Sequence, residues 1–473
     1  MDIEEFRRNA HQVVDWIAQY MQTIRARPVR SPCRPGEIYE RLPQHAPEQA
    51  DSFAQVFQDF RQLIMPGITH WQHPRFFAYF PANSSFPSLL AEMLTAALGA
   101  QCMSWQTSPA ATELEQRVME WLRQLIGLPA DFTGVIQGGA STATLVALLT
   151  ARERAHAFAA NTQGLARLPV MTVYCSQEAH SSVERAVRIA GLGSANLRKI
   201  AVDSTYAMVP EALEKAIAAD ISRGLHPLAV IVATGTTGST AIDPLAAIVA
   251  IAKRYNLWVH VDAAYAGTAL VLPNMRHIIA GIEGVDSFVF NPHKWLFTNF
   301  DCSAYFVKDV PALTRTFAIL PEYLKTREGA QVVNYRDWGI PLGRRFRALK
   351  LWFVLRLFGA QGIRDRVARH MAWARETADD IRASKDFELL APVPLATVCF
   401  RYHPAGTDDP AALDSLNTRL LEQVNDSGSL YITHTRLGGA YCLRFVVGQT
   451  YVTAEDVREA WADIATTARG LSH

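Results

Sequence analysis

The chain has 473 residues, and 49% of them are hydrophobic, so it can form a large domain with one or two smaller segments attached. Its 46 basic side chains nearly cancel its 45 acidic ones. This balance disfavours partners that are recognised mainly by charge, such as nucleic acid or an anionic membrane surface. The composition favours a protein that binds a small molecule.

The six cysteines and the N-terminus indicate the compartment. The cysteines are widely scattered and lack the spacing of a zinc site or a redox C-x-x-C pair, so we expect reduced thiols and no metal. The chain begins MDIEE, which is acidic where a signal peptide is basic, and no apolar run reaches membrane-spanning length. We therefore expect a cytoplasmic protein that does not contact a membrane.

Residues 1–84 are expected to form an N-terminal helical segment. Apolar residues recur at helical spacing over residues 3–24, which predicts an amphipathic helix, and a second helix is predicted over residues 53–63. An amphipathic helix needs a surface to cover its apolar face. The pattern fits packing on the same chain and clasping a second subunit equally well.

Residues 85–370 alternate short apolar runs with helical stretches, which predicts a large α/β domain whose mostly parallel sheet is covered on both faces. The clearest predicted strands are 170–174, 228–233, 258–261 and 287–290, and the clearest predicted helices are 211–221 and 244–255. Residues 371–473 contain a helical stretch, the strand-like ATVCFRY, another helix and AYCLRFVV, which predict a small α+β domain.

Lys294 follows the last of these strands in the segment NPHKW. Most lysines are solvated surface charges, but Trp295, Leu296 and Phe297 make the surroundings of this one apolar. A desolvated amine loses its proton more readily, as a Schiff-base lysine requires.

Four other segments also fall at strand ends, where open α/β sheets bind ligands. The small residues of VIQGGASTATLVALL (135–149) would let backbone N–H groups approach an oxyanion at a helix N-terminus, although the segment is equally typical of an ordinary helix start. Asp262 ends an apolar strand in WVHVDAAYAG. An acidic residue at this place can be an ordinary turn residue, or it can hold a proton on the ring nitrogen of a ligand. His180 and the pair Thr236-Thr237 follow two further strands, where a flat imidazole could stack on a planar cofactor.

In this order and spacing, the segments resemble the pyridoxal-5′-phosphate-dependent decarboxylases of group II, specifically the aromatic-L-amino-acid decarboxylases. The resemblance covers nearly the whole chain, from HWQHPRFFAYFP through SPAATELE, AHSSVERA, HVDAAYAG, NPHKWL and NFDCSAYFVK to IPLGRRFRALKLWFVLR. It implies the cofactor pyridoxal 5′-phosphate (PLP) and the fold of the PLP-dependent transferases, known as fold type I or the aspartate-aminotransferase-like fold.

The resemblance also implies roles for individual residues. Lys294 matches the Schiff-base lysine, Asp262 the partner of the pyridine nitrogen, and His180 the residue that stacks on the ring. Thr237 and Ala264 would lie close to the ring, and the phosphate would contact Gly139, Ala140, Ser141, Asn291 and His293. Gly139 stands where many members carry serine, which removes one hydroxyl contact.

Family members are homodimers whose N-terminal helices wrap the partner, which implies substrate-binding residues from both subunits. Trp71, Tyr79, Phe80 and Pro81 would line the substrate side, and Gln101 and Met103 would reach in from the other subunit. Ala82, Gln101 and Met103 depart from the usual residues at their positions. Gly343 in PLGRRF would leave room for an indole ring, unless glycine is needed there only for backbone geometry.

Residues 321–338 carry several charges and little apolar periodicity, which predicts a mobile loop that closes over the site or an ordinary surface loop. Tyr323 matches the family's loop tyrosine, which donates a proton to the substrate α-carbon. Relatives that form aldehydes tend to carry phenylalanine there, or asparagine at the position of His180.

These residues favour decarboxylation of an aromatic L-amino acid, of the tryptophan, DOPA, 5-hydroxytryptophan or tyrosine type, to the corresponding amine and CO2. An aromatic aldehyde synthase on the same scaffold is the first alternative. A regulatory dimer that binds PLP without turnover is the second.

Overall fold

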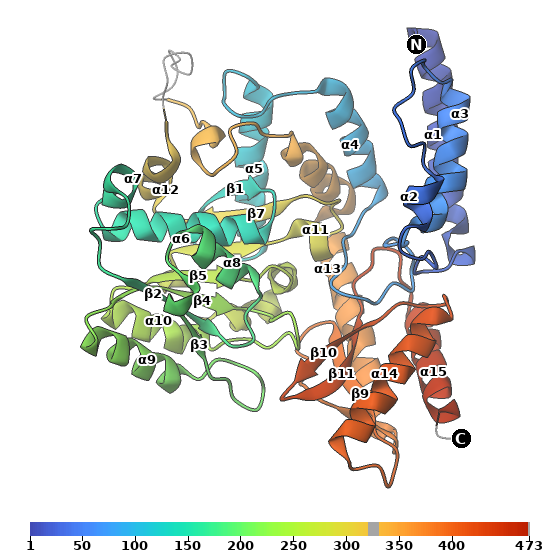
Figure 1. Cartoon of the computed structure of the whole chain (residues 1–473). Coiled ribbons are helices and arrows are strands. Elements are labelled where there is room, and N and C mark those ends of the chain that lie inside the picture. Colours follow the sequence, from blue (N-terminus) through green and yellow to red (C-terminus); the bar gives the residue numbers. More distant parts are fainter. Residues whose placement is uncertain (320–330, 472–473) are drawn as a thin grey trace. The chain divides into compact units, whose positions relative to one another are not determined.

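The structure is a computed structural model that describes residues 1–319 and 331–471 (Figure 1). The chain forms two compact units. The first contains Met1–Pro81, Glu376–Leu390 and Phe400–His473, and the second contains Ala82–Arg375 and Ala391–Cys399. Within the described residues, no helix has the length and apolar character needed to cross a membrane.

The second unit is built on a seven-stranded sheet with the strand order β1-β7-β6-β5-β4-β2-β3. Strand β7 pairs antiparallel with both of its neighbours, and the other pairs are parallel, which confirms the predicted mostly parallel sheet. The carboxyl ends of β1, β6, β5, β4 and β2 consequently lie at one edge. The strands are β1 (Thr133–Gln137), β2 (Met171–Ser176), β3 (Leu197–Ile200), β4 (His226–Ala233), β5 (Trp258–Asp262), β6 (Ser287–Phe290) and β7 (Ser303–Val307).

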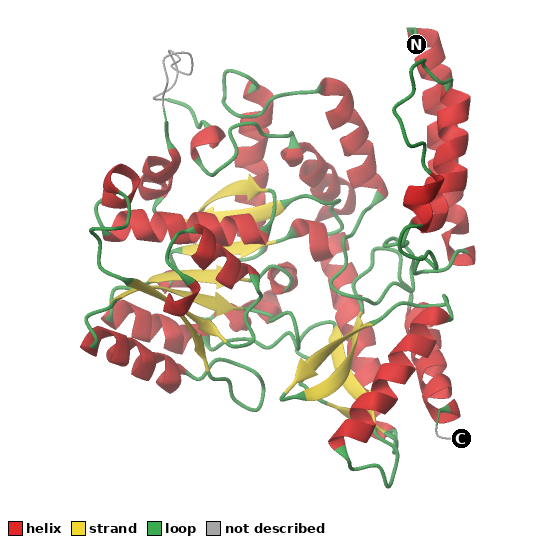
Figure 2. Cartoon of the chain, in the orientation of Figure 1, coloured by secondary structure: helices red, strands yellow, loops and turns green. Residues whose placement is uncertain are grey.

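Helices cover both faces of this sheet, as its nearly continuous apolar strands require (Figure 2). Ala229 and Ile231 of β4 belong to the apolar core beneath α6 (Ala140–Ala155) and α8 (Ser182–Ile189). Because side chains alternate along a strand, Val230 and Val232 point to the opposite face, where α9 (Pro210–Ser222) and α10 (Leu245–Arg254) contact β4. The predicted helices 211–221 and 244–255 are therefore confirmed.

Further helices complete the second unit. They are α4 (Phe86–Leu98), α5 (Pro109–Leu125), α7 (Ala159–Gln163), α11 (Pro292–Trp295) and α12 (Val310–Phe317). Short 3-10 turns are Ser194–Asn196, Ala266–Val271, Pro273–Ile279, Ile282–Gly284 and Tyr335–Asp337. Helix α13 (Arg347–Ala383) is interrupted at Gly359, whose φ of 65° is left-handed, and its last residues belong to the first unit.

The first unit contains the predicted N-terminal helix as α1 (Ile3–Thr23). Trp16 of α1 packs edge-on against Phe57 and Phe60, which lie in α3 (Phe53–Asp59) and the π-helical turn that extends it to Ile64. The remaining elements are Ile24–Ala26, α2 (Glu37–Arg41), Met65–Gly67, α14 (Pro410–Asp426), α15 (Ala454–Gly470) and a sheet of β10 (Thr433–Leu437), β11 (Ala440–Val446), β9 (Thr397–Tyr402) and β8 (Phe387–Leu389). The first three residues of β9, 397–399, are counted with the second unit.

Candidate active site

The predicted cofactor residues of the second unit follow strands that end at the same edge of the sheet. Gly139 follows β1, His180 follows β2, Thr237 follows β4, Asp262 ends β5, and Lys294 follows β6. The register places Asp262 opposite Ala233 of β4 and opposite Val289 of β6. The topology thus brings together segments that lie more than a hundred residues apart in the chain.

Lys294 lies in a short turn that we call the lysine turn, residues 291–297. Asn291 begins the turn, and its backbone N–H donates to the carbonyl of Ala264 (2.9 Å), which joins it to the segment after β5. The side-chain oxygen of Asn291 accepts from Ser303 Oγ (2.6 Å) at the start of β7. The lysine backbone N–H donates to Asn291 O (2.9 Å), so the half-buried Lys294 projects from a turn fixed to two strands.

Asp262 is half-buried at the carboxyl end of β5. Its Oδ1 accepts from the backbone N–H of Ala264 (3.0 Å), and its own carbonyl accepts from Thr234 N (2.9 Å). These bonds orient the carboxylate at the strand end. A carboxylate held in this way can keep a proton on a heterocyclic nitrogen placed beside it.

The imidazole of His180 is held in one orientation by Ser182. Nδ1 accepts from the backbone N–H of Ser182 (3.2 Å) and lies 2.8 Å from its hydroxyl oxygen. Desolvation lowers the pKa of His180, the negative charge of Asp262 opposes this shift, and the positive charge of Lys294 adds to it. A neutral, flat ring therefore lies within electrostatic range of both residues.

Residues 138–141, at the N-terminus of α6, form a segment that we call the cradle because it can hold an anion. Gly139 precedes the helix in an extended conformation, and no side chain caps the first turn of α6. Free N–H groups and the helix dipole make such an end favourable for an anion. A Cβ on Gly139 would meet nothing within 4 Å, whereas a Cβ on Gly138 would lie 3.0 Å from Asp301 Oδ2.

An ion pair that the sequence analysis did not identify lies behind the cradle. Arg347 binds both carboxylate oxygens of Asp301, with Nε–Oδ1 3.1 Å and Nη2–Oδ2 3.0 Å. Burial raises the pKa of Asp301, but the hydrogen bonds and charge of Arg347 outweigh it, and the net pKa is lowered. Both residues fall in motifs that carried the resemblance, yet no local pattern indicated that they pair.

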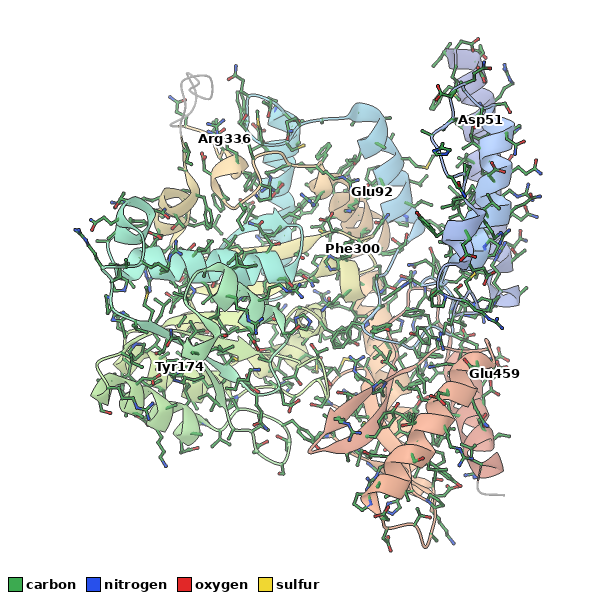
Figure 3. All side chains as sticks on the ribbon, viewed as in Figure 1. Asp51, Glu92, Tyr174, Phe300, Arg336 and Glu459 are labelled. Atoms are coloured by element: carbon green, nitrogen blue, oxygen red, sulfur yellow. The ribbon has the colours of Figure 1, made fainter. Side chains whose placement is uncertain are left out.

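His293, predicted to contact the phosphate, is a buried neutral residue. Its Nδ1 accepts from the backbone N–H of Cys302 (2.9 Å), and its ring centroid lies 4.6 Å from that of Phe300, which Figure 3 labels. Burial lowers the pKa of His293 to about 3. At neutral pH this residue can donate or accept a hydrogen bond but contributes no positive charge.

The two threonines after β4 differ in their surroundings. Thr236 is buried, and its hydroxyl accepts from Ala241 N (3.0 Å), so it stabilises its own turn. Thr237 is exposed. Asp243, also buried, accepts from Met208 N and Ala233 N at 2.8 Å each and braces the base of this turn.

The predicted substrate-side residues of the first unit form an aromatic cluster. The rings of Trp71 and Tyr79 stack with centroids 5.7 Å apart, and the hydroxyl oxygens of Tyr79 and Tyr431 lie 3.3 Å apart. The guanidinium of Arg444 lies 4.3 Å from the ring centroid of Phe80, next to the buried Pro81. Tyr431 and Arg444 were not predicted, because no motif in the sequence surrounds them.

Other predicted substrate residues belong to the second unit. Gln101 Oε1 accepts from the backbone N–H of Arg344 (2.7 Å), and a Cβ on Gly343 would lie 3.2 Å from Gln101 Nε2. Both Gln101 and Gly343 are exposed, whereas Met103 and Ala82 are half-buried. Gln101 and Gly343 are therefore direct neighbours within one chain.

The prediction of a mobile or surface loop over residues 321–338 is wrong for its last residues. Tyr335 and Trp338 are buried, and Trp338 O accepts from Gln137 Nε2 (2.9 Å). Arg336 lies between them and is labelled in Figure 3. Its backbone N–H donates to Met103 O (2.8 Å). Apolar burial of the two aromatic rings anchors this part of the chain. Tyr323 lies outside the described residues.

Known proteins match this chain along its whole length. The family model "Pyridoxal-dependent decarboxylase conserved domain" matches residues 35–403. Phenylacetaldehyde synthase from Arabidopsis thaliana is 44% identical, covering 100% of this chain and 98% of that protein. Tyrosine decarboxylase 2 from Narcissus pseudonarcissus is 43% identical over 98% of this chain and 93% of its own length. The crystal structure of Oryza sativa TDC with PLP and tryptamine superposes with a TM-score of 0.97 at 36% identity, covering 100% of this chain and 99% of that one.

Proposed function

Because the chain belongs to the group II pyridoxal-dependent decarboxylases, in their aromatic-amino-acid branch, we propose that it converts an aromatic L-amino acid to the corresponding arylalkylamine and CO2. Its cofactor is pyridoxal 5′-phosphate. The observation that carries the proposal is the placement of Lys294, Asp262 and His180 after neighbouring or nearby strands at one edge of the sheet.

The chain has a suitable group for each part of this cofactor. The uncapped N-terminus of α6 suits the phosphate, with Gly139, Ala140 and Ser141 as its backbone donors. Asn291 and His293 would complete the phosphate site from the lysine turn, and Thr237 and Ala264 would flank the ring. The open space at Gly139 fits an anion that approaches the backbone closely.

Each polar side chain then has a defined task. When bound, PLP supplies an electron sink for the pair of electrons left by CO2. Asp262 holds a proton on the ring nitrogen and so stabilises negative charge that develops in the transition state. The neutral imidazole of His180 would stack on the ring, and Lys294 would supply the amine that holds the cofactor covalently and can be exchanged for the substrate amine.

The choice between amine and aldehyde depends on how the substrate α-carbon is protonated. Tyr323, which lies outside the described residues, supports amine formation because it matches the family's loop tyrosine, and a phenol could supply the proton to the α-carbon before oxygen reacts. His180 supports it as well, because aldehyde-forming relatives tend to carry asparagine at that position. Proteins of both kinds, a phenylacetaldehyde synthase and a tyrosine decarboxylase, are similar to this chain, so the product must be measured.

For the substrate we propose an aromatic L-amino acid, with tolerance for indoles. Gly343 leaves the backbone without a side chain where a larger ring would enter, and Gln101 beside it offers an amide to a polar ring substituent. Trp71, Tyr79, Phe80 and Pro81 would line the substrate side, with Ala82 near the substrate carboxylate. Gln101 and Met103 would reach in from the other subunit. Tryptophan, tyrosine, DOPA and 5-hydroxytryptophan are the candidates.

We also propose a homodimer with shared active sites. Helix α4 exposes five large apolar side chains at helical spacing, each with 43–64% of its surface accessible: Phe86, Leu90, Met93, Leu94 and Leu98. A stripe of this size on one helix is typical of a surface that another chain covers. The exposure of Gln101 and Gly343 suits residues that complete a site of the partner.

We assign three regions of the chain to this proposed dimer. Residues 1–84 would clasp the partner, residues 85–370 would bind PLP, and residues 371–473 would form the small domain. The cytoplasm is the proposed compartment, and the six cysteines, all within the described ranges, are free thiols as expected there.

The test is incubation of the PLP-loaded protein with aromatic L-amino acids and with glutamate as an acidic control. CO2, amine, aldehyde and hydrogen peroxide are measured together. We expect amine and CO2 in equal amounts from at least one aromatic substrate, with little peroxide. Aldehyde with peroxide would identify an aldehyde synthase, and the absence of CO2 from every substrate would favour the regulatory dimer.

The variant Tyr323→Phe separates the two enzyme alternatives further. It keeps the ring and loses only the proton donor, so amine formation should fall while oxygen uptake per CO2 rises. Amine formed at the wild-type rate without oxygen uptake would remove Tyr323 from this role.

A further inference from the structure

Asn83 lies 211 residues before Lys294 in the sequence and contacts the lysine turn directly. Its side-chain Nδ2 donates to the backbone carbonyl of Lys294 (2.8 Å), and its backbone N–H donates to the carbonyl of His293 (3.2 Å). Asn83 is almost fully buried, with 1% of its surface accessible. One residue thus binds the carbonyl of the lysine and the carbonyl before it.

These contacts matter because the helical turn that carries Lys294 is very short. Helix α11 contains only Pro292–Trp295, and the last carbonyls of any helix have no partner within the helix. A donor from elsewhere in the fold can therefore bind the Lys294 carbonyl, and Asn83 provides one. A buried carbonyl without such a donor would be costly, so the bond restricts the orientation of the turn.

The same segment binds the end of the lysine turn and the residues that follow it. Ser85 Oγ donates to the carbonyl of Phe297 (2.7 Å), whose φ of 54° is left-handed, and Ser88 Oγ accepts from the backbone N–H of Asn299 (2.8 Å). Ser85 is also the N-cap of α4, accepting from Ser88 N (3.4 Å). The start of α4 and the lysine turn are thereby one hydrogen-bonded structure.

We propose that Asn83 is a positioning residue for Lys294, aiming its amine at the cofactor carbonyl through hydrogen bonds to the backbone of residues 293 and 294. This inference rests on the proposed function, because it assumes that Lys294 forms the covalent bond to PLP. Asn83 does not touch the reacting atoms in this role. Its loss should slow the covalent step and leave the binding of the rest of the cofactor intact, since covalent reactions depend steeply on the placement of the reacting groups.

The experiment compares wild type with Asn83→Ala and Asn83→Asp in the full chain. Aspartate has nearly the same shape as asparagine and keeps the backbone N–H, but its ionised side chain cannot donate a hydrogen bond. If Asn83→Ala fails to fold, the comparison is made with Asn83→Asp. Two quantities are measured on apoprotein. One is the rate at which added PLP develops the absorption of the lysine-bound form, and the other is the Kd of pyridoxamine 5′-phosphate, which cannot bond to the lysine.

A matched control is Asn417→Ala in the first unit. Asn417 is fully buried and, like Asn83, donates its amide to backbone carbonyls, those of Tyr402 (2.8 Å) and Leu413 (2.9 Å). It should lower thermal stability without changing either cofactor measurement. Loss of a buried asparagine is then separated from loss of lysine positioning.

We expect the Asn83 variants to attach PLP roughly tenfold more slowly, with Kd for pyridoxamine 5′-phosphate within about twofold of wild type. An unchanged attachment rate would overturn the inference, and so would a matching loss of affinity for pyridoxamine 5′-phosphate, which would indicate general damage. Failure of the wild-type protein to attach PLP at all would instead contradict the proposed function.

Discussion

Asp262 ends strand β5, and Lys294 lies in the turn that follows β6, the strand hydrogen-bonded to β5. The bond from Asn291 N to Ala264 O (2.9 Å) joins the two segments beyond the strand ends. A carboxylate and an amine are therefore placed by the same piece of backbone. Under the proposed function, one planar molecule would bond covalently to Lys294 and place its ring nitrogen at Asp262.

The variant Asp262→Asn tests the carboxylate. We expect a folded protein that binds PLP but decarboxylates about 10²–10³-fold more slowly, because one preorganised electrostatic partner is lost. Single-turnover kinetics with a saturating aromatic substrate would measure the effect. A rate within about threefold of wild type would mean that the ring nitrogen is not protonated by Asp262.

The two glycines of the cradle should respond differently to a side chain. Gly138→Ala would place Cβ 3.0 Å from Asp301 Oδ2, and Asp301 cannot withdraw easily because Arg347 binds both of its oxygens. We expect the Kd of Gly138→Ala for PLP to rise by roughly tenfold or more, because overpacking a filled site typically costs about 1–3 kcal/mol. Gly139→Ser enters open space and should bind PLP at least as tightly as wild type. Equal affinities of the two variants would contradict this account of the cradle.

Three buried histidines of the second unit predict how stability depends on pH. Burial lowers the pKa of His293 and His370 to about 3 and that of His260 to about 4, whereas an unfolded histidine titrates near 6.5. Between these values the unfolded chain binds protons that the folded chain does not. The free energy of unfolding should therefore fall as the pH falls from about 6.5 towards 4.

His370→Gln tests one of these contributions while keeping an acceptor for Trp295 Nε1, which donates to His370 Nδ1 at 3.0 Å. Urea unfolding over this pH range should show a slope reduced by roughly 1.4 kcal/mol per pH unit. An unchanged slope would mean that His370 is protonated in the folded protein.

Substrate choice should depend on Gly343 and Gln101 together. A serine at position 343 would crowd Gln101 Nε2, which lies 3.2 Å from the new Cβ. We expect Gly343→Ser to lower the tryptophan-to-tyrosine ratio of kcat/KM by roughly tenfold, a usual penalty for one extra group in a substrate pocket. The fall should be smaller when Gln101 is also changed to alanine. A ratio unaffected by Gly343→Ser would show that this glycine serves backbone geometry alone.

The sequence predicted those features that depend on neighbouring residues. Continuous apolar runs gave the positions of β2, β4, β5 and β6, because a strand covered on both faces must be apolar throughout. The same strand ends identified Asp262 and Lys294 as candidates. The antiparallel β7 between β1 and β6 could not be predicted in this way, since strand order depends on pairing between distant segments.

Contacts between distant residues were missed for the same reason. The Asp301–Arg347 pair spans 46 residues and the Asn83–Lys294 contact spans 211, so no local spacing indicates either. The prediction of a loop was wrong at its end because it relied on the charged residues of this segment. Two aromatic residues among them, Tyr335 and Trp338, are buried in the core. Local patterns therefore identified the candidate side chains, and the fold was needed to show which backbone and side-chain groups hold them.

The central claim, that Lys294 is the residue bonded to PLP, can be tested by reducing the PLP-loaded protein with borohydride and mapping the modified peptide by mass spectrometry. Reduction makes the bond between lysine and cofactor permanent, so the modified residue is identified directly. The account predicts a phosphopyridoxyl group on Lys294 and on no other lysine in substantial amount. Modification at another lysine, such as the buried Lys350, or no modified peptide from protein that had bound PLP, would contradict it.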